Sequence, residues 1–152
     1  MNLIKQFKIL PIFQKYSIII SVIILCISLT QPAFYIDREE DPGAWAESWM
    51  LFLFGWTFPL GGGITGFLFW CANPIYILSI IQIIRKKKVG IILSIIASII
   101  AFSFSLMDEI TASSSGSLSK ITSLELGYKL WLASLITLTI GTLISLIINK
   151  KK

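Results

Sequence analysis

Carboxylate side chains are concentrated in one short polar stretch of the 152-residue chain. Residues 34–49 read FYIDREEDPGAWAESW, and they include five acids and one arginine. Such oxygens can hold a hard divalent cation, a basic segment of a partner or a polar substrate. The regular ligand spacing of a calcium-binding loop is missing, and Asp-Pro-Gly is typical of a turn, so a simple solvated loop is the alternative. The candidate binding residues here are Asp37, Arg38, Glu39, Glu40, Asp41 and Glu47.

Two further sites carry polar side chains beside apolar runs. Asp108 and Glu109 follow the uncharged residues 89–107. Acids at the carboxyl end of a helix are disfavoured by its dipole, so we expect this pair to serve a binding role and to face the first acidic stretch. Asn73 precedes Pro74 in the sequence WCANP, and the proline frees a backbone carbonyl. Asn73 therefore either makes a structural hydrogen bond or lines a polar site within a membrane-spanning helix.

Catalytic and metal chemistry have little support in this sequence. The chain has no histidine, which is the commonest general base and metal ligand. Its two cysteines, Cys26 and Cys71, form no Cys-x-x-Cys pair and are predicted to be packing residues. We therefore predict no enzyme activity, no catalytic residues, no metal and no cofactor. Catalysis by outer carboxylates, for example Asp37 or Glu40 with Asp108, is the competing hypothesis.

The elements that must position these residues are membrane-spanning helices. Apolar residues make up 55% of the chain and charged residues 14%, and the mean hydropathy is +0.84. A span needs roughly 20 apolar residues. The sequence predicts an all-α, four-transmembrane-helix bundle in a single membrane domain, residues 1–152. The predicted spans are residues 16–34, 60–84, 89–107 and 130–148.

The second predicted span follows an unusually long uncharged region. Residues 48–84 as one helix would be roughly 55 Å long, which exceeds the thickness of a membrane. Pro59 and the glycines at 61–63 are expected to break the helix. We therefore predict a short interfacial helix at residues 44–56, in the first outer loop. Rings at the membrane surface are expected to anchor the chain in the lipid bilayer; these predicted anchors are Trp45, Trp49, Trp56, Trp70, Tyr128 and Trp131.

The positions of lysine and arginine in the sequence predict how the chain is oriented in the membrane. Ten of the 13 basic residues fall within residues 5–15, 85–88 and 150–152, where there are no acids. All eight acids fall in the other two connections. Because cytoplasmic flanks retain basic residues, both termini are predicted to be cytoplasmic and the acids to lie outside. The pI of about 9.3 thus reflects topology, and no nucleic-acid partner is expected.

Small residues recur at helical spacing within the predicted spans. Examples are Ser94, Ala97 and Ala101 in the third span and Gly141 and Ser145 in the fourth. Such stripes let helix backbones approach closely inside lipid, which favours a compact bundle. Homo-oligomerisation through one stripe is the alternative use. The serine-rich residues 110–125 are predicted to form a mobile loop.

Two short motifs resemble a group of small uncharacterised bacterial inner-membrane proteins. Trp70-Cys71-Ala72-Asn73-Pro74 is similar to their Trp-x-Ala-Asn-Pro element, and residues 127–134 (GYKLWLAS) are similar to the entry to their last helix. The resemblance implies four spans and a bacterial inner membrane, and it implies no catalytic residues. Cys71 departs from the group's pattern, so the resemblance implies no role for its thiol.

These observations favour a non-enzymatic integral membrane protein that binds a partner through its acidic outer face. The partner would be either another membrane subunit or an incoming protein. In the first case the chain would be an accessory subunit, and in the second it would be similar to a bacteriocin-immunity protein. The alternative is a small transporter or channel subunit with a kinked second span. Against transport, no charged residue lies in any predicted span and no inverted repeat is visible.

Overall fold

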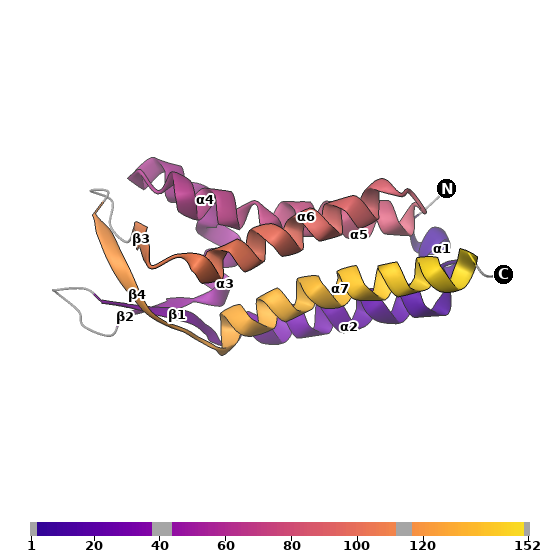
Figure 1. Cartoon of the computed structure of the whole chain (residues 1–152), viewed down its shortest axis with the longest axis horizontal. Helices are drawn as coiled ribbons and strands as arrows, with labels where there is room; N and C mark the ends of the chain where they lie inside the picture. Colours follow the sequence, from indigo (N-terminus) through magenta and orange to yellow (C-terminus); the bar gives the residue numbers. More distant parts are fainter. Residues whose placement is uncertain (1–2, 38–43, 112–116, 151–152) are drawn as a thin grey trace.

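Four apolar helical stretches lie side by side and are covered at one end by a small β-sheet (Figure 1). The computed structural model describes residues 3–37, 44–111 and 117–150. The helical stretches are α2 (Ile12–Ser28), α4 with α5 (Ile64–Trp70 and Ala72–Ile84), α6 (Val89–Ser103) and α7 (Leu126–Lys150). A short helix α1 (Leu3–Lys8) precedes α2. Both chain ends lie at the end opposite the sheet.

Three of these helices are long and apolar enough to cross a membrane: Ile64–Ile84, Val89–Leu106 and Leu126–Ile148. The second of these ranges includes the 3-10 turn η2 (Phe104–Leu106). The helix α2 is equally apolar but shorter, with 17 residues. The predicted membrane character of the chain agrees with these helices.

Close helix packing follows the stripes of small residues. The helix α2 packs against α7, α5 against α6, and α6 against α7. Ser94, Ala97 and Ala101 are buried on α6, as the stripe predicted. Hydrogen bonds join the same helices: the Ser79 hydroxyl donates to the Gly90 carbonyl oxygen at 2.8 Å, and the side-chain oxygens of Ser98 and Thr139 lie 3.0 Å apart.

The sheet has four antiparallel strands in the order β2-β1-β4-β3. They are β1 (Pro32–Asp37), β2 (Ala44–Glu47), β3 (Glu109–Thr111) and β4 (Leu118–Leu124). Phe34 and Ile36 of β1 and Ile110 of β3 are buried against the bundle, whereas Asp37 and Glu109 are exposed. The sheet is therefore apolar on its inner face and polar on its outer face, as expected for one solvated side.

The all-α prediction is only partly correct: the described chain is mostly helical, but two stretches expected to be helix or loop contain strands. The first span was predicted to reach residue 34, but α2 ends at Ser28 and Pro32 begins β1. Proline lacks a backbone donor, and from Phe34 to Asp37 the residues alternate between buried and more exposed positions. The predicted mobile loop at 110–125 instead contributes to β3 and β4, which pair with each other and with β1.

The predicted interfacial helix is also only partly correct. Residues 44–47 are strand β2, and the helix α3 covers only Ser48–Phe54. The 3-10 helix η1 (Gly55–Gly61) follows, and Pro59 lies within it. Gly62 then adopts a left-handed conformation with φ of 78°, so the break falls where the sequence predicted it. The next helix begins at Ile64 rather than residue 60.

Candidate functional site

Aromatic side chains join the sheet to the bundle. The Phe104 ring lies 5.4 Å from Phe34, 5.2 Å from Phe69 and 5.3 Å from Tyr128, measured between ring centroids. These rings come from η2, β1, α4 and α7, so one residue contacts the sheet and two different helices. Phe104 is 5% exposed. Rings at these distances and tilted angles pack favourably, which fixes the sheet on the bundle.

A pocket of about 80 Å³ lies beside this cluster, beneath the inner face of the sheet. Its walls come from the ends of α2 and α7, from β1 and β3, and from α3, η1, α4, α5 and η2. The lining is almost entirely carbon, and it includes eight aromatic side chains: Phe34, Phe52, Phe58, Phe69, Trp70, Phe104, Tyr128 and Trp131. We call it the subsheet pocket.

Asn73 contributes a polar side chain to the wall of the subsheet pocket. It is 7% exposed, and its side-chain oxygen accepts a hydrogen bond of 2.8 Å from the Trp131 indole N–H. This bond joins α5 to α7. Of the two roles that the sequence left open for Asn73, it corresponds to the structural hydrogen bond. Nearby, Tyr128 donates to the Ala101 carbonyl oxygen at 2.9 Å and so joins α7 to α6.

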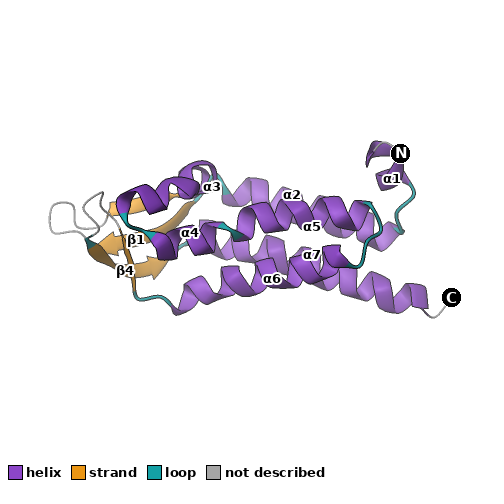
Figure 2. Ribbon diagram, turned by 90° about the horizontal axis from the view of Figure 1, so that it is seen from above, coloured by secondary structure: helices purple, strands orange, loops and turns teal. Residues whose placement is uncertain are grey.

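One wall of the pocket is the hairpin of α3, η1 and α4. The Trp70 indole N–H donates to the Phe52 carbonyl oxygen at 2.9 Å, which ties α4 to α3. Gly55 faces the Trp70 ring so closely that an added Cβ would lie 2.8 Å from Trp70 Cγ. Figure 2 shows α3 and α4 at the same end of the molecule as the sheet. The hairpin therefore belongs to the sheet end of the protein.

The first turn of α7 packs closely against the start of β1. A Cβ at Gly127 would lie 2.6 Å from the carbonyl oxygens of both Gln31 and Pro32, and it would also meet Ser48 Oγ. The Ser48 hydroxyl donates to the Gln31 carbonyl oxygen at 2.7 Å. Glycine is thus required at 127, because rigid backbone atoms occupy the space of a side chain.

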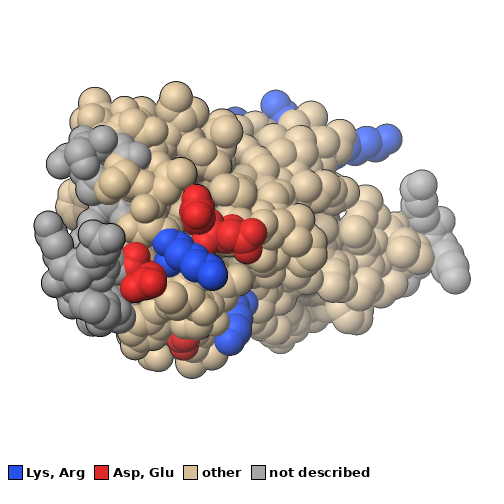
Figure 3. All heavy atoms as spheres, turned by 60° about the vertical axis from the view of Figure 1, so that its left-hand side comes forward, with Lys and Arg blue, Asp and Glu red and all other residues tan. Residues whose placement is uncertain are grey.

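Charged residues mark the outer face of the sheet. Lys120 of β4 lies directly opposite Asp37 of β1 and directly opposite Glu109 of β3. Directly opposite residues of antiparallel strands share a face, so the lysine lies between two carboxylates. Figure 3 shows acidic and basic side chains close together on this end of the molecule. Among the described residues, the fold therefore brings Asp37 and Glu109 onto one face of the sheet, with the cation of Lys120 between them.

The other predicted binding residues are spread more widely. Asp108 is exposed, and its carbonyl oxygen accepts a hydrogen bond of 2.8 Å from the Ile121 backbone N–H. The Glu47 carboxylate accepts a hydrogen bond from the Trp49 indole. Four predicted residues lie outside the described part of the chain, namely Arg38, Glu39, Glu40 and Asp41.

The predicted aromatic anchors divide into two groups. Trp49 and Trp56 are exposed, as an anchor should be. Tyr128 is buried, so its ring does not reach the surface where a lipid anchor acts, and Trp70 and Trp131 form inward hydrogen bonds. Trp45 lies in strand β2 rather than in the predicted interfacial helix.

The described residues contain no group of three or more His, Cys, Asp or Glu side chains that could hold a metal ion. Both cysteines are free. Cys26 is exposed on α2, so the predicted packing role is wrong for this residue, whereas Cys71 is half-buried between α4 and α5.

Several residues that build the site escaped the sequence analysis. Phe34 and Phe104 fall within the uncharged helices that the sequence predicts, and neither is among the predicted site residues. The available signal was the spacing of aromatic residues near the ends of the apolar runs. It could have indicated a shared cluster, but the strands that complete the cluster pair over long sequence distances.

Comparison of the chain with protein-family models, with curated proteins and with solved structures gives no match in any of the three.

Proposed function

We propose that this chain is a non-enzymatic integral membrane protein that crosses the membrane four times and binds a protein partner through its sheet. The bilayer surrounds α2, α4–α5, α6 and α7, and the sheet lies outside the cytoplasm. We place the protein in a bacterial inner membrane, which is the location implied by the resemblance in the WCANP and GYKLWLAS elements.

Apolar side chains on the outside of the helices support the membrane placement. Ile23 of α2, Ile99 of α6 and Ile140 of α7 are each about half exposed. In water so much exposed apolar surface would favour aggregation, whereas in lipid it is solvated. At 1.5 Å per residue, α2 reaches about 25 Å, a few ångströms short of a typical hydrocarbon core. A modest local thinning of the bilayer accommodates this difference.

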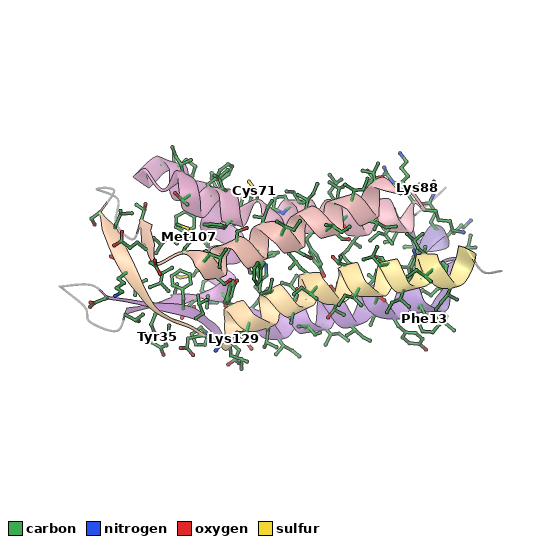
Figure 4. The ribbon with its side chains drawn as sticks, in the orientation of Figure 1. Phe13, Tyr35, Cys71, Lys88, Met107 and Lys129 are labelled. Carbon is green, nitrogen blue, oxygen red and sulfur yellow. The ribbon has the colours of Figure 1, made fainter. Side chains whose placement is uncertain are left out.

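The distribution of charge supports the orientation. Lys88 lies at the end that holds both termini, and Tyr35 and Lys129 lie at the sheet end (Figure 4). The basic residues 85–88 form the turn between α5 and α6, while every described acid lies in the sheet end. Because basic flanks stay in the cytoplasm, the sheet end is exported.

The observation that carries partner binding is the difference between the connections. A four-residue turn is enough to join α5 to α6. The two connections at the other end instead fold into a sheet that is fixed by the Phe104 cluster and directs polar side chains away from the bundle. The described charges in and next to the sheet are five acids and two lysines, and this excess of acids favours a partner with a basic surface. These acids are Asp37, Glu47, Asp108, Glu109 and Glu125.

Site-specific photo-cross-linking in living cells tests this function. A photoreactive amino acid replaces Thr122, an exposed residue of β4, and in a second strain replaces Lys88 at the opposite end. We expect a discrete cross-linked product at 122 and none of that size at 88. Glu109→Lys in the Thr122 strain should abolish the product, because it reverses a charge that faces the partner.

Glu109→Gln is the matched control, since it keeps the size of the side chain and removes only its charge. It should weaken cross-linking less than Glu109→Lys does. Only uncross-linked monomer at position 122, or a product unaffected by Glu109→Lys, would contradict partner binding through this face.

An accessory subunit and a bacteriocin-immunity-like protein are the two forms of this proposal. The identity of the cross-linked protein separates them: a resident membrane protein supports the first, and an added toxin the second. We do not propose transport, because the hydrogen bond to Trp131 gives Asn73 a structural role at the kinked helix.

A further inference from the structure

The chemistry of the subsheet pocket restricts what can enter it. A polar ligand group there would lose its hydrogen bonds to water and find almost only carbon around it. Apolar cavities of this kind stay dry and accept apolar guests. The volume of about 80 Å³ is roughly half that of an engineered cavity known to bind benzene, so there is space for a few methylene groups.

The depth of the pocket places it beside lipid chains. Trp131 lies five residues beyond the start of α7 at Leu126, or about 7 Å along the helix axis. Asn73, on the neighbouring helix α5, lines the same pocket. In the membrane placement proposed above, the inner end of the pocket therefore lies level with the upper methylenes of the outer leaflet, while its outer end is covered by β1 and β3.

The surroundings of the pocket are apolar on the hairpin side. Leu51, Phe58 and Phe69 line it from the α3–η1–α4 hairpin and are only partly buried, so this wall is not fully shielded from the surroundings. The outer side chains of that hairpin are also apolar, with Leu60 84% exposed and Ile64 65% exposed. An apolar chain that approaches from the lipid phase on this side therefore meets mainly apolar side chains.

We propose that the subsheet pocket binds a segment of a phospholipid acyl chain from the surrounding outer leaflet, close to its ester end. The aromatic walls hold the methylenes, and the sheet above excludes water. The proposal rests on the membrane placement, but it does not depend on the protein partner. An apolar side chain of a partner is the competing occupant.

Photoreactive phospholipids test this directly. The purified full-length protein is placed in nanodiscs of phosphatidylethanolamine and phosphatidylglycerol that contain a lipid with a diazirine either near the ester or near the chain terminus. Cross-linked peptides are mapped after irradiation. We expect the ester-proximal probe to label pocket-lining residues such as Phe58 and Phe69, and both probes to label the exposed Ile23 on α2.

Two variants fill the pocket from different walls. Ala33→Leu enters from β1 and Leu51→Trp from α3. Each should reduce pocket labelling by about tenfold, which corresponds to losing nearly two buried methylene groups. Labelling at Ile23 should not change. Ala33→Gly is the matched control, since it changes the same position without filling the pocket, and it should retain full labelling.

Three results would overturn the proposal. The first is labelling confined to outer surfaces such as Ile23, which leaves the membrane placement intact. The second is pocket labelling that persists in both filling variants. The third, with a photoreactive residue at Leu51 in cells, is cross-linking to a protein partner in place of lipid. Absence of lipid labelling anywhere on the chain would contradict the membrane placement as well.

Discussion

The middle of the bundle and the junction beneath the sheet are held together by different kinds of contact. In the bundle, Ser21 of α2 donates to the Ser134 carbonyl oxygen of α7 at 2.7 Å. Its single hydroxyl proton is then used, so Tyr76 of α5 must be the donor in the 2.6 Å Tyr76–Ser21 bond. Three helices therefore meet at one serine. At the junction, four aromatic rings pack together, and hydrogen bonds such as that from Tyr128 to the Ala101 carbonyl oxygen lie around them.

This difference follows from the solvent around each region. Lipid is as apolar as a leucine side chain, so apolar burial gives helices in a bilayer little reason to associate, and close approach and polar contacts decide their packing. In the proposed orientation the outer face of the sheet lies in water and the junction lies at the lipid boundary beneath it, where burying aromatic area between the sheet and the bundle keeps that area from water and is strongly stabilising. The two regions should therefore respond differently to the same kind of substitution.

Removing the central ring of the junction should have the largest effect. Phe104→Ala should destabilise the sheet end by about 3–5 kcal/mol, the range for losing a buried phenylalanine. Amide hydrogen exchange in mild detergent should rise in β1 and β4 and stay slow in α2 and α7. Phe102→Ala, two residues away and exposed, is the control and should leave exchange unchanged. Equal loss of protection throughout the bundle would remove the distinction between the regions.

Crowding the contact between α7 and β1 should have the next largest effect. Gly127→Ala places a methyl group against two backbone carbonyl oxygens, and overpacking of this kind costs about 1–3 kcal/mol. Thermal unfolding of the purified protein should show a lower midpoint. The neighbouring exposed residue provides the control, Leu126→Ala, for which little change is expected. An unchanged midpoint in Gly127→Ala would mean that the junction adjusts easily.

A polar substitution in the bundle should cost less. Tyr76→Phe removes one hydroxyl and keeps the ring, and interhelical hydrogen bonds in membranes contribute about 0.6 kcal/mol on average and at most about 1.7. Ser21 can still donate to Ser134 in this variant. Unfolding in detergent should show a small loss of stability, with hydrogen exchange of the sheet unaffected. A loss as large as that of Phe104→Ala would contradict the ranking.

The smallest effect is expected on the outer face of the sheet. Lys120→Ala leaves the carboxylates of Asp37 and Glu109 without the cation between them. Exposed ion pairs contribute little, so the loss of stability should be smaller than in the three variants above. It should disappear in 1 M salt, where the screening length is about 3 Å. An effect that persists in high salt would indicate that Lys120 acts through packing.

The helices were predictable because their signal is local. An uncharged apolar run that starts after a basic cluster needs no distant partner, so α6 begins at Val89 as predicted and Gly62 breaks the chain within the predicted segment. The end of α2 was misplaced because Ala33 and Phe34 are as apolar as the helix before them. Only Pro32 and the alternation from Phe34 to Asp37 indicated a strand.

The sheet and the pocket could not be predicted from local sequence patterns. The strand β4 lies in a serine-rich segment whose composition is typical of a loop, and it is stabilised by pairing with β1, some 85 residues earlier. Asn73, Trp70, Tyr128 and Trp131 were singled out separately, but nothing local indicates that they line one cavity. Their arrangement depends on long-range pairing, which no periodicity in the sequence reports.

The central claim is that the sheet lies outside the cytoplasm and the turn between α5 and α6 lies inside it. Labelling with a membrane-impermeant maleimide tests this claim most directly. Cys26 and Cys71 are first replaced by serine, and single cysteines are introduced by Thr122→Cys in β4 and by Lys88→Cys in the turn between α5 and α6. The account predicts that intact cells are labelled at position 122 and that position 88 reacts only after the membrane is permeabilised. Labelling at 88 in intact cells, with position 122 protected, would contradict it.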